Sequence, residues 1–116
     1  MSLSECLELV ARGDPDRFVT LRAAPPEARA RLAPLYALNL ELARAPWASA
    51  EPMIAEMRLQ WWRDALAEID AGQAPRGHAV LAALAPAIVS GQLPVALLDA
   101  MAEARRRDIW REPFAD

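Results

Sequence analysis

The stretch RLQWWRDAL, residues 58–66, decides the fold of this chain. Neighbouring residues in an α-helix differ by about 100° around its axis, so Trp61 and Trp62 point to different faces. A surface helix needs only one apolar face. On a helical wheel, the apolar arc of this helix is far wider, and it is formed by Ile54, Met57, Leu59, Trp61, Trp62, Ala65, Leu66 and Ile69. We therefore expect a central helix in a bundle, with the two tryptophans facing different neighbouring helices.

Composition is consistent with one soluble helical domain. The 116 residues carry a net charge of −3, contain no lysine, and are rich in alanine, leucine, glutamate and arginine, which favour helix. The mildly acidic balance gives no footprint for nucleic-acid binding. The single cysteine, Cys6, cannot form an internal disulfide, and no apolar run approaches the roughly 18 residues of a membrane span. We expect a cytoplasmic protein, and peripheral association with a membrane surface stays open.

Caps, prolines and glycines divide the chain into six predicted helices. Ser2 and Glu5 form a capping box, and Asp14 precedes a proline at a first helical position. Pro34 lies inside a predicted helix, where we expect a kink or a break. The segments APWASA and GQAPRG read as a linker and a loop, and no strand pattern occurs. The fold class is therefore all-α, a helical bundle, with helices expected at residues 3–12, 15–22, 26–44, 52–71, 78–90 and 94–110.

Polar residues fall within three predicted apolar faces. Arg58 lies near the centre of the wide arc, Asn39 lies among leucines, and Arg105 lies inside the stripe of the last helix with Asp108 at its edge. A charge in such a place is costly unless it is paired or reaches a polar cavity. Two interpretations stay open: a buried network that fixes helix register, or a cavity lined by Arg58 and Arg105 that suits an anion such as phosphate. The candidate cavity residues are Asn39, Arg58, Trp62, Arg105 and Asp108.

Other residues give weaker signals. Asp64 and Glu68 are four residues apart, as a magnesium-binding pair could be, but they lie on the polar arc, which favours a solvated face. His78 begins a helix without a partner histidine, so a capping or surface role is favoured over a ligand role. Cys6 has no histidine near it in sequence, so nothing supports a nucleophile. The basic run ARRRD reads as a solvated face. These residues predict no metal site.

Four segments together resemble the squalene/phytoene synthase family. They are DPDRF, LYALNLELAR, EPMIAEMRLQWWRDAL and EARRRDIWREPFAD, in an order and spacing similar to the N-terminal half of such proteins, from Asp14 to Asp116. The resemblance implies the all-α isoprenoid synthase fold, a bundle around a cavity where prenyl diphosphates bind through magnesium. Catalytic members join two such substrates head to head, through a cyclopropyl intermediate, to phytoene, dehydrosqualene or squalene.

One departure from the family concerns the first aspartate-rich magnesium motif. Aligned on LYA, the positions of those aspartates read Ala43, Arg44 and Trp47, and Glu41 alone does not supply clustered oxygen ligands. Magnesium is therefore expected only if the diphosphate site is retained. The segment NLELAR followed by EPM and RLQWW looks closer to the branch that includes a mitochondrial complex I assembly factor. That similarity implies a non-catalytic isoprenoid-diphosphate binder or an assembly factor.

The second departure is length. Family members are more than twice this size, and their second aspartate motif lies in the other half. We therefore expect residues 1–116 to form a partial domain that has no condensation activity alone. Apolar helix faces left open by a half-bundle predict a homo-oligomer that covers them. The alternative function is that of one part of a prenyltransferase that condenses two prenyl diphosphates head to head.

Overall fold

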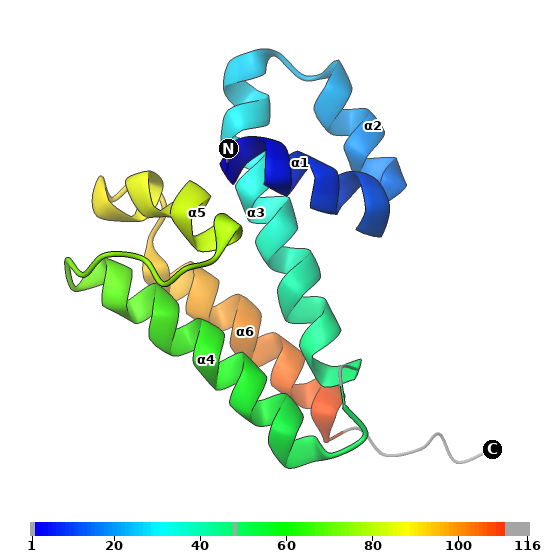
Figure 1. Cartoon of the computed structure of the whole chain (residues 1–116), viewed down its shortest axis with the longest axis vertical. Coiled ribbons are helices and arrows are strands. Elements are labelled where there is room, and N and C mark those ends of the chain that lie inside the picture. The colour runs from blue at the N-terminus through cyan, green and yellow to red at the C-terminus, as the bar shows by residue number, and fades with distance from the viewer. Residues whose placement is uncertain (1, 48, 111–116) are drawn as a thin grey trace.

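The computed structural model describes residues 2–47 and 49–110, which form helices without any strand. The elements are α1 (Ser2–Gly13), α2 (Pro15–Ala23), α3 (Pro26–Arg44), the 3-10 helix η1 (Ala45–Trp47), α4 (Pro52–Asp70), α5 (Ala79–Val89) and α6 (Val95–Ile109) (Figure 1). The predicted all-α class is confirmed. Each predicted helix is present, with ends that agree with the observed ones to within one or two residues.

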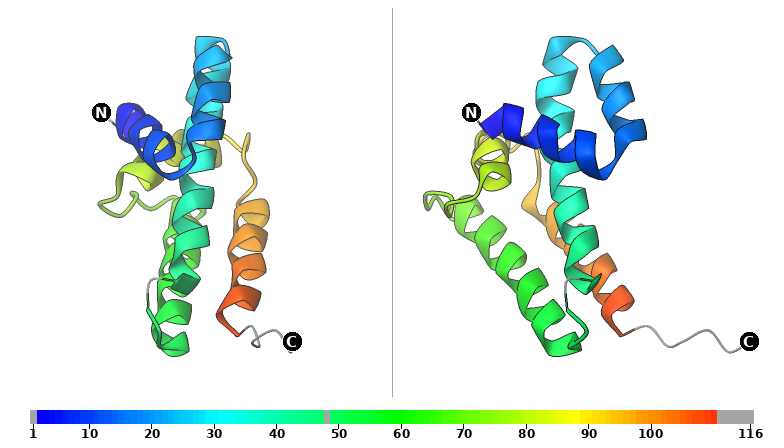
Figure 2. Two further views of the ribbon diagram at one scale, coloured as in Figure 1. Left: turned by 90° about the vertical axis from the view of Figure 1, so that its right-hand side faces the viewer. Right: turned by 45° about the vertical axis from the view of Figure 1, so that its right-hand side comes forward.

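The helices pack around one apolar core. α4 and α6 lie side by side and antiparallel, and α3 packs against α6 (Figures 1 and 2). α1 crosses α3, and α2 folds back along the beginning of α3. α5 closes the core between α1, α3 and α4. The largest fully buried side chains come from all six α-helices and include Val10, Leu21, Leu38, Leu42, Leu66, Ile69, Leu81, Leu84 and Leu98.

Two details of α3 bear on the sequence-based expectations. Pro34 does not break the helix, which runs without interruption from Pro26 to Arg44. Pro34 is buried, so packing of its ring in the core offsets the hydrogen bond that a proline cannot donate. The first part of the expected linker is also structured, because Ala45–Trp47 forms the turn of 3-10 helix that continues α3.

The buried face of α4 is narrower than the apolar arc of its sequence. Ala55, Leu59, Trp62, Ala65, Leu66 and Ile69 are buried. Ile54, Met57 and Trp61, by contrast, are 44, 67 and 38% exposed. The prediction that both tryptophans pack against neighbouring helices is therefore wrong for Trp61. Its ring instead contacts His78 and Arg76 in the segment that precedes α5.

Helix ends follow the capping signals of the sequence. The Asp14 carboxylate accepts a hydrogen bond from the Arg17 amide at 3.3 Å at the start of α2. The Nδ1 atom of His78 accepts one from the Val80 amide at 3.1 Å at the start of α5, which confirms the capping interpretation. Gly91, with φ +79°, follows the end of α5 in the left-handed region that favours glycine. None of the helices built by the described residues is long and apolar enough to cross a membrane.

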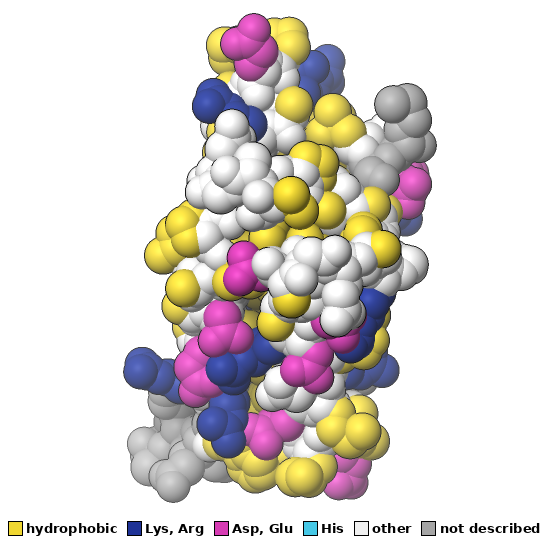
Figure 3. Space-filling model, turned by 90° about the vertical axis from the view of Figure 1, so that its left-hand side faces the viewer, with side chains coloured by type: hydrophobic (Ala, Val, Ile, Leu, Met, Phe, Trp, Pro, Cys, Tyr) yellow, Lys and Arg dark blue, Asp and Glu magenta, His cyan; other side chains and the backbone are white. Residues whose placement is uncertain are grey.

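Hydrophobic side chains also lie on the outside of the bundle. One face of the molecule carries them between acidic and basic side chains (Figure 3). Four of the large exposed ones, Trp47, Met53, Ile54 and Met57, lie on or beside the first half of α4, and all are at least 44% exposed. This group, Trp47, Met53, Ile54 and Met57, is the apolar edge of α4.

Candidate functional site

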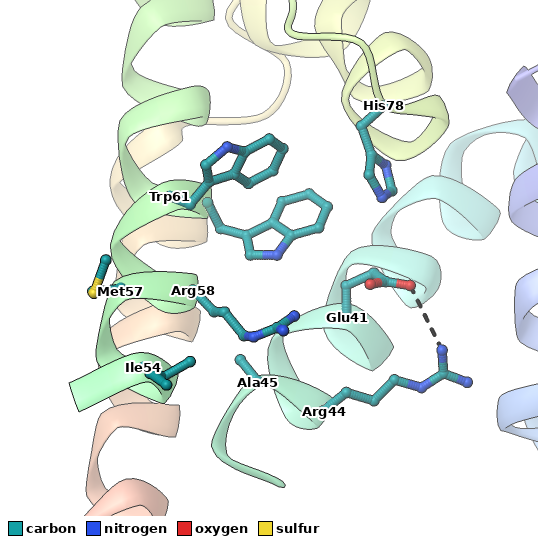
Figure 4. Close-up of a pocket in the computed structure, with 9 residues that line it drawn as sticks. Glu41, Arg44, Ala45, Ile54, Met57, Arg58, Trp61 and His78 are labelled. Atoms are coloured by element: carbon teal, nitrogen blue, oxygen red, sulfur yellow. Dashed lines mark ion pairs between the residues drawn. The ribbon is translucent and has the colours of Figure 1, made fainter. Parts of the chain in front are cut away.

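An open pocket of about 610 Å³ lies between the end of α3, the first half of α4 and the segment that leads into α5. Its lining combines apolar, aromatic and charged side chains; Arg58, Trp61 and His78 project into a common space, whereas Met57 and Arg44 point away from it (Figure 4). The lining residues are Glu41, Arg44, Ala45, Ile54, Met57, Arg58, Trp61, Trp62 and His78. Such a lining suits a ligand with an anionic end and an apolar body.

Arg58 projects from α4 into this pocket toward the end of α3 (Figure 4). By the 100° spacing it shares a side of α4 with the buried Trp62 and Ala65. Arg58 is exposed, so it does not take part in a buried network that fixes helix register. The reason is that solvent enters between α3 and α4 at this level, whereas α5 covers the second half of α4. Arg58 forms no hydrogen bond or ion pair with any described residue.

The end of α3 supplies the opposite wall of the pocket. The Glu41 carboxylate lies 3.8 Å from the Arg44 guanidinium, and their side chains are 21 and 55% exposed. Glu41 is the only carboxylate among the lining residues. Of the three positions where the family resemblance places aspartates, Arg44 lines the pocket, Ala43 is half-buried and Trp47 is 64% exposed.

An aromatic cluster forms the third wall. The rings of Trp61 and Trp62 meet edge to face with centroids 5.0 Å apart, and the His78 ring lies 4.8 Å from that of Trp62. The Arg76 guanidinium lies 5.2 Å over the ring of Trp61, in cation–π geometry. These contacts join the loop before α5 to α4, so the wall is held from both sides.

Arg76 is itself fixed by a carboxylate of α4. It donates two hydrogen bonds to Glu68, at 3.0 and 2.6 Å, and these bonds lower the pKa of the Glu68 carboxyl. Asp64 accepts a hydrogen bond from Gln60 at 2.7 Å. The side chains of Asp64 and Glu68 therefore each have a hydrogen-bond partner on α4 or in the loop before α5. Arg76 was not predicted from the sequence, because it lies in a loop and its contacts with α4 leave no periodic signal.

The other candidate residues form a separate contact between α3 and α6. Arg105 donates a hydrogen bond to Asn39 Oδ1 at 3.3 Å and lies 3.6 Å from the Asp108 carboxylate. All three residues are half-buried, and none of them lines the pocket that contains Arg58. The five candidates thus divide into Arg58 and Trp62 in the pocket and a three-residue network elsewhere. The geometry of that network is suited to fixing the register of α3 against α6.

The described residues do not fit a magnesium ion. No three histidine, cysteine, aspartate or glutamate side chains come together, in the part of the chain that the structure describes, as a group that could hold a metal. Magnesium bound to a diphosphate usually takes one or two carboxylates from the protein, held free to coordinate. Glu41, the one carboxylate in the pocket, is instead close to Arg44.

Comparison with known proteins identifies the family. The model of the squalene/phytoene synthase family matches residues 10–116, which include every residue that lines the pocket. The last six of these residues, 111–116, carry the end of the EARRRDIWREPFAD segment and lie outside the described residues. Searches of the curated proteins and of the solved structures gave no match. Because the family model covers nearly the whole chain, this protein belongs to the squalene/phytoene synthase family.

Proposed function

We propose that this chain binds a prenyl diphosphate in the pocket between α3 and α4, and that it does not condense two of them. The observation that carries the proposal is Arg58, a guanidinium that lines the pocket and pairs with no described residue. A guanidinium presents a planar fork of N–H donors that matches the oxygens of a phosphate. An arginine left unpaired in a pocket is suited to an anion that arrives from solution.

The rest of the lining supports an isoprenoid body on that anion. Ile54 and Trp61 offer apolar surface beside Arg58, and both are partly exposed, so a prenyl chain would cover them. Burial of such surface contributes about 25 cal/mol per Å². The lack of clustered carboxylates in the described part of the chain supports the second half of the proposal, since the family chemistry uses them to hold magnesium.

Titration of the chain with farnesyl diphosphate, followed by tryptophan fluorescence and by calorimetry, tests the proposal. Binding should be saturable, and Arg58→Gln should weaken it about tenfold, the usual loss with one charge-assisted contact in an open site. Arg107→Gln is the matched control, because Arg107 is exposed on α6 and makes no hydrogen bond or ion pair with described residues. Farnesol and pyrophosphate, each with half of the recognition features, should bind more weakly. Equal binding by wild type and Arg58→Gln would contradict the proposal.

Family membership supports a second candidate function, in which the chain is one part of a head-to-head prenyl synthase. Product analysis of the complete protein, supplied with farnesyl or geranylgeranyl diphosphate and magnesium, distinguishes the two. Phytoene, squalene or a cyclopropyl diphosphate precursor would establish the synthase. Substrate that is bound but returned unchanged would favour the non-catalytic binder.

The resemblance of the NLELAR segment to the assembly-factor branch supports a third use, assistance in building a respiratory complex. Deletion of the gene, followed by native gel analysis of complex I, tests it. One informative result is that the assembled complex is lost in the deletion strain and restored by the wild-type gene but not by the Arg58→Gln variant. That result would show that the assembly role depends on the pocket. Normal assembly in the deletion strain would exclude the role.

A further inference from the structure

The charges in the pocket favour an anion without help from a metal. Two arginines, Arg44 and Arg58, line it against the single carboxylate of Glu41. The Glu41–Arg44 pair is loose, at 3.8 Å, and the Arg44 side chain is 55% exposed, so this guanidinium keeps donors available. Arg58 has no partner among the described residues. The pocket therefore carries an excess positive charge before any ligand enters.

The same residues argue against a bridging cation. A metal that joins a diphosphate to the protein needs clustered oxygen ligands, and the pocket has one carboxylate beside a guanidinium. At one of the positions where the resemblance places a magnesium-binding aspartate stands Arg44, whose charge has the opposite sign. A divalent cation at that position would be repelled by Arg44 and Arg58, whereas a phosphate would be attracted by both.

The two arginines can both reach an anion in the pocket. Arg58, from the first half of α4, extends into the pocket, whereas Arg44, at the end of α3, extends past Glu41 and away from Arg58 (Figure 4). The Arg44 side chain is exposed and its ion pair is loose, so a change of rotamer can turn its guanidinium toward the pocket that it lines. Guanidinium groups bind phosphate oxygens through paired N–H donors, so the two can then share the oxygens of one diphosphate. Ile54 and the tryptophans lie beside Arg58 and can accept the apolar part of the ligand.

We infer that Arg44 and Arg58 bind the diphosphate group of the ligand directly, and that the positive charge of these two side chains replaces that of a bridging divalent cation. This inference rests on the proposed function, because it describes how the same pocket holds its ligand. It has a consequence that a metal-bridged site does not share. Free magnesium competes for the diphosphate oxygens in solution, so it should leave the affinity unchanged or lower it.

The experiment is a pair of calorimetric titrations with farnesyl diphosphate, one in excess EDTA and one in millimolar magnesium chloride. The expected result is an affinity in EDTA that equals or exceeds the affinity in magnesium. Binding that requires magnesium would overturn the inference and leave the proposed function in place. Lack of binding in both buffers would overturn the proposed function and the inference with it.

The variant Glu41→Gln distinguishes a metal-bridged diphosphate site from one in which the arginines bind the diphosphate directly. A metal-bridged site would lose affinity when its one carboxylate is removed. Direct binding predicts unchanged or tighter binding, because Arg44 is released from its loose ion pair. Arg44→Gln and Arg58→Gln should each weaken binding about tenfold in EDTA, and Arg107→Gln should not. Thermal melts of all four variants show whether each is folded, and retained affinity in either arginine variant of the pocket would overturn the inference.

Discussion

Arg63 of α4 binds the carboxylate of Asp99 on α6 with two parallel hydrogen bonds, at 2.7 and 3.0 Å, and reaches Glu103 at 2.7 Å. Glu56 and Arg106 form a further ion pair between the same helices, and Trp110 donates to Glu56 at 2.9 Å. These bonds form a ladder of charges along the antiparallel pair of α4 and α6. The hydrogen bond from Arg106 and, to a smaller extent, that from Trp110 lower the pKa of the Glu56 carboxyl.

Substitution of Arg63 tests how much this ladder stabilises the pair of helices. Side chains of Arg63, Asp99 and Glu103 are 28, 45 and 52% exposed, so solvent screens the attraction. Arg63→Met should lower the free energy of unfolding by about 1 kcal/mol, the upper end for exposed pairs, because the bidentate geometry is good. Arg107→Met, on the exposed side of α6, is the control and should change little. Equal urea midpoints for the two variants would show that the ladder contributes nothing.

Arg29 holds the end of α2 against the start of α3. Its guanidinium donates hydrogen bonds to the carbonyl oxygens of Leu21, Arg22 and Ala24, at 3.1, 3.1 and 3.2 Å. Carbonyls at the end of a helix have no partner within that helix. Arg29→Met should therefore cost about 2 kcal/mol of the free energy of unfolding.

Urea denaturation followed by circular dichroism measures the effect of Arg29→Met. Arg31→Met is the matched control, because Arg31 is exposed on the same helix and makes no hydrogen bond or ion pair with described residues. If both variants unfold at the same urea concentration, the three bonds to the end of α2 do not stabilise the fold.

The two adjacent tryptophans should differ in their effect on stability. Trp62 is 6% exposed in the core, and Trp61 is 38% exposed at the pocket. Trp62→Ala removes a large buried ring and should cost about 3–5 kcal/mol. Trp61→Ala loses partial burial and the contact with Arg76, and should cost about 1 kcal/mol. Chemical denaturation of both variants measures the difference. Similar losses of unfolding free energy would mean that the Trp61 ring stabilises the fold as much as the Trp62 ring does.

The sequence predicts the fold well because its signals are local. Helix ends follow from Asp14, His78 and Gly91, and the apolar periodicity identifies most of the core. The exposure of Arg58 could not be predicted in the same way. A wheel gives the side of α4 on which Arg58 lies, but the distance to α3 at that level depends on how the two helices pack. For the same reason the Arg63–Asp99 ion pair could not be predicted from the sequence, because the register between helices far apart in the chain leaves no local signal.

The apolar edge of α4 supports the expectation of self-association. Its side chains, Trp47, Met53, Ile54 and Met57, are 64, 62, 44 and 67% exposed. We propose that a second copy covers Trp47, Met53 and Met57, so light scattering should give a mass above that of one chain. Met57→Glu should return the protein to a monomer, because a charge in an apolar contact is costly. Leu97→Glu, at a site 60% exposed on α6, is the control. A monomeric wild type, including one that binds lipid vesicles instead, would contradict the proposal.

Cys6 should make stability fall at alkaline pH. Its thiol is fully buried, and burial, with a smaller effect from the charge of Glu5, raises its pKa from 9.0 to about 11. Between these two values the unfolded chain has released the proton and the folded chain has kept it, so the folded state binds more protons. The free energy of unfolding therefore declines as pH rises through this window, and the full effect of two pKa units is about 3 kcal/mol.

The measurement is urea denaturation at a series of pH values from about 8 to 11, for wild type and Cys6→Ala. Arginine and tyrosine side chains contribute equally in both proteins, so the difference between the two curves isolates the thiol. That difference should be constant below pH 9.0, the ordinary pKa of a thiol. Above pH 9.0, the free energy of unfolding of the wild type should fall relative to that of Cys6→Ala. A thiol reagent at pH about 8 should also leave folded Cys6 unmodified, because the thiolate is the reactive form and the site is closed. Parallel stability curves across the whole range would show that Cys6 titrates alike in the folded and unfolded states.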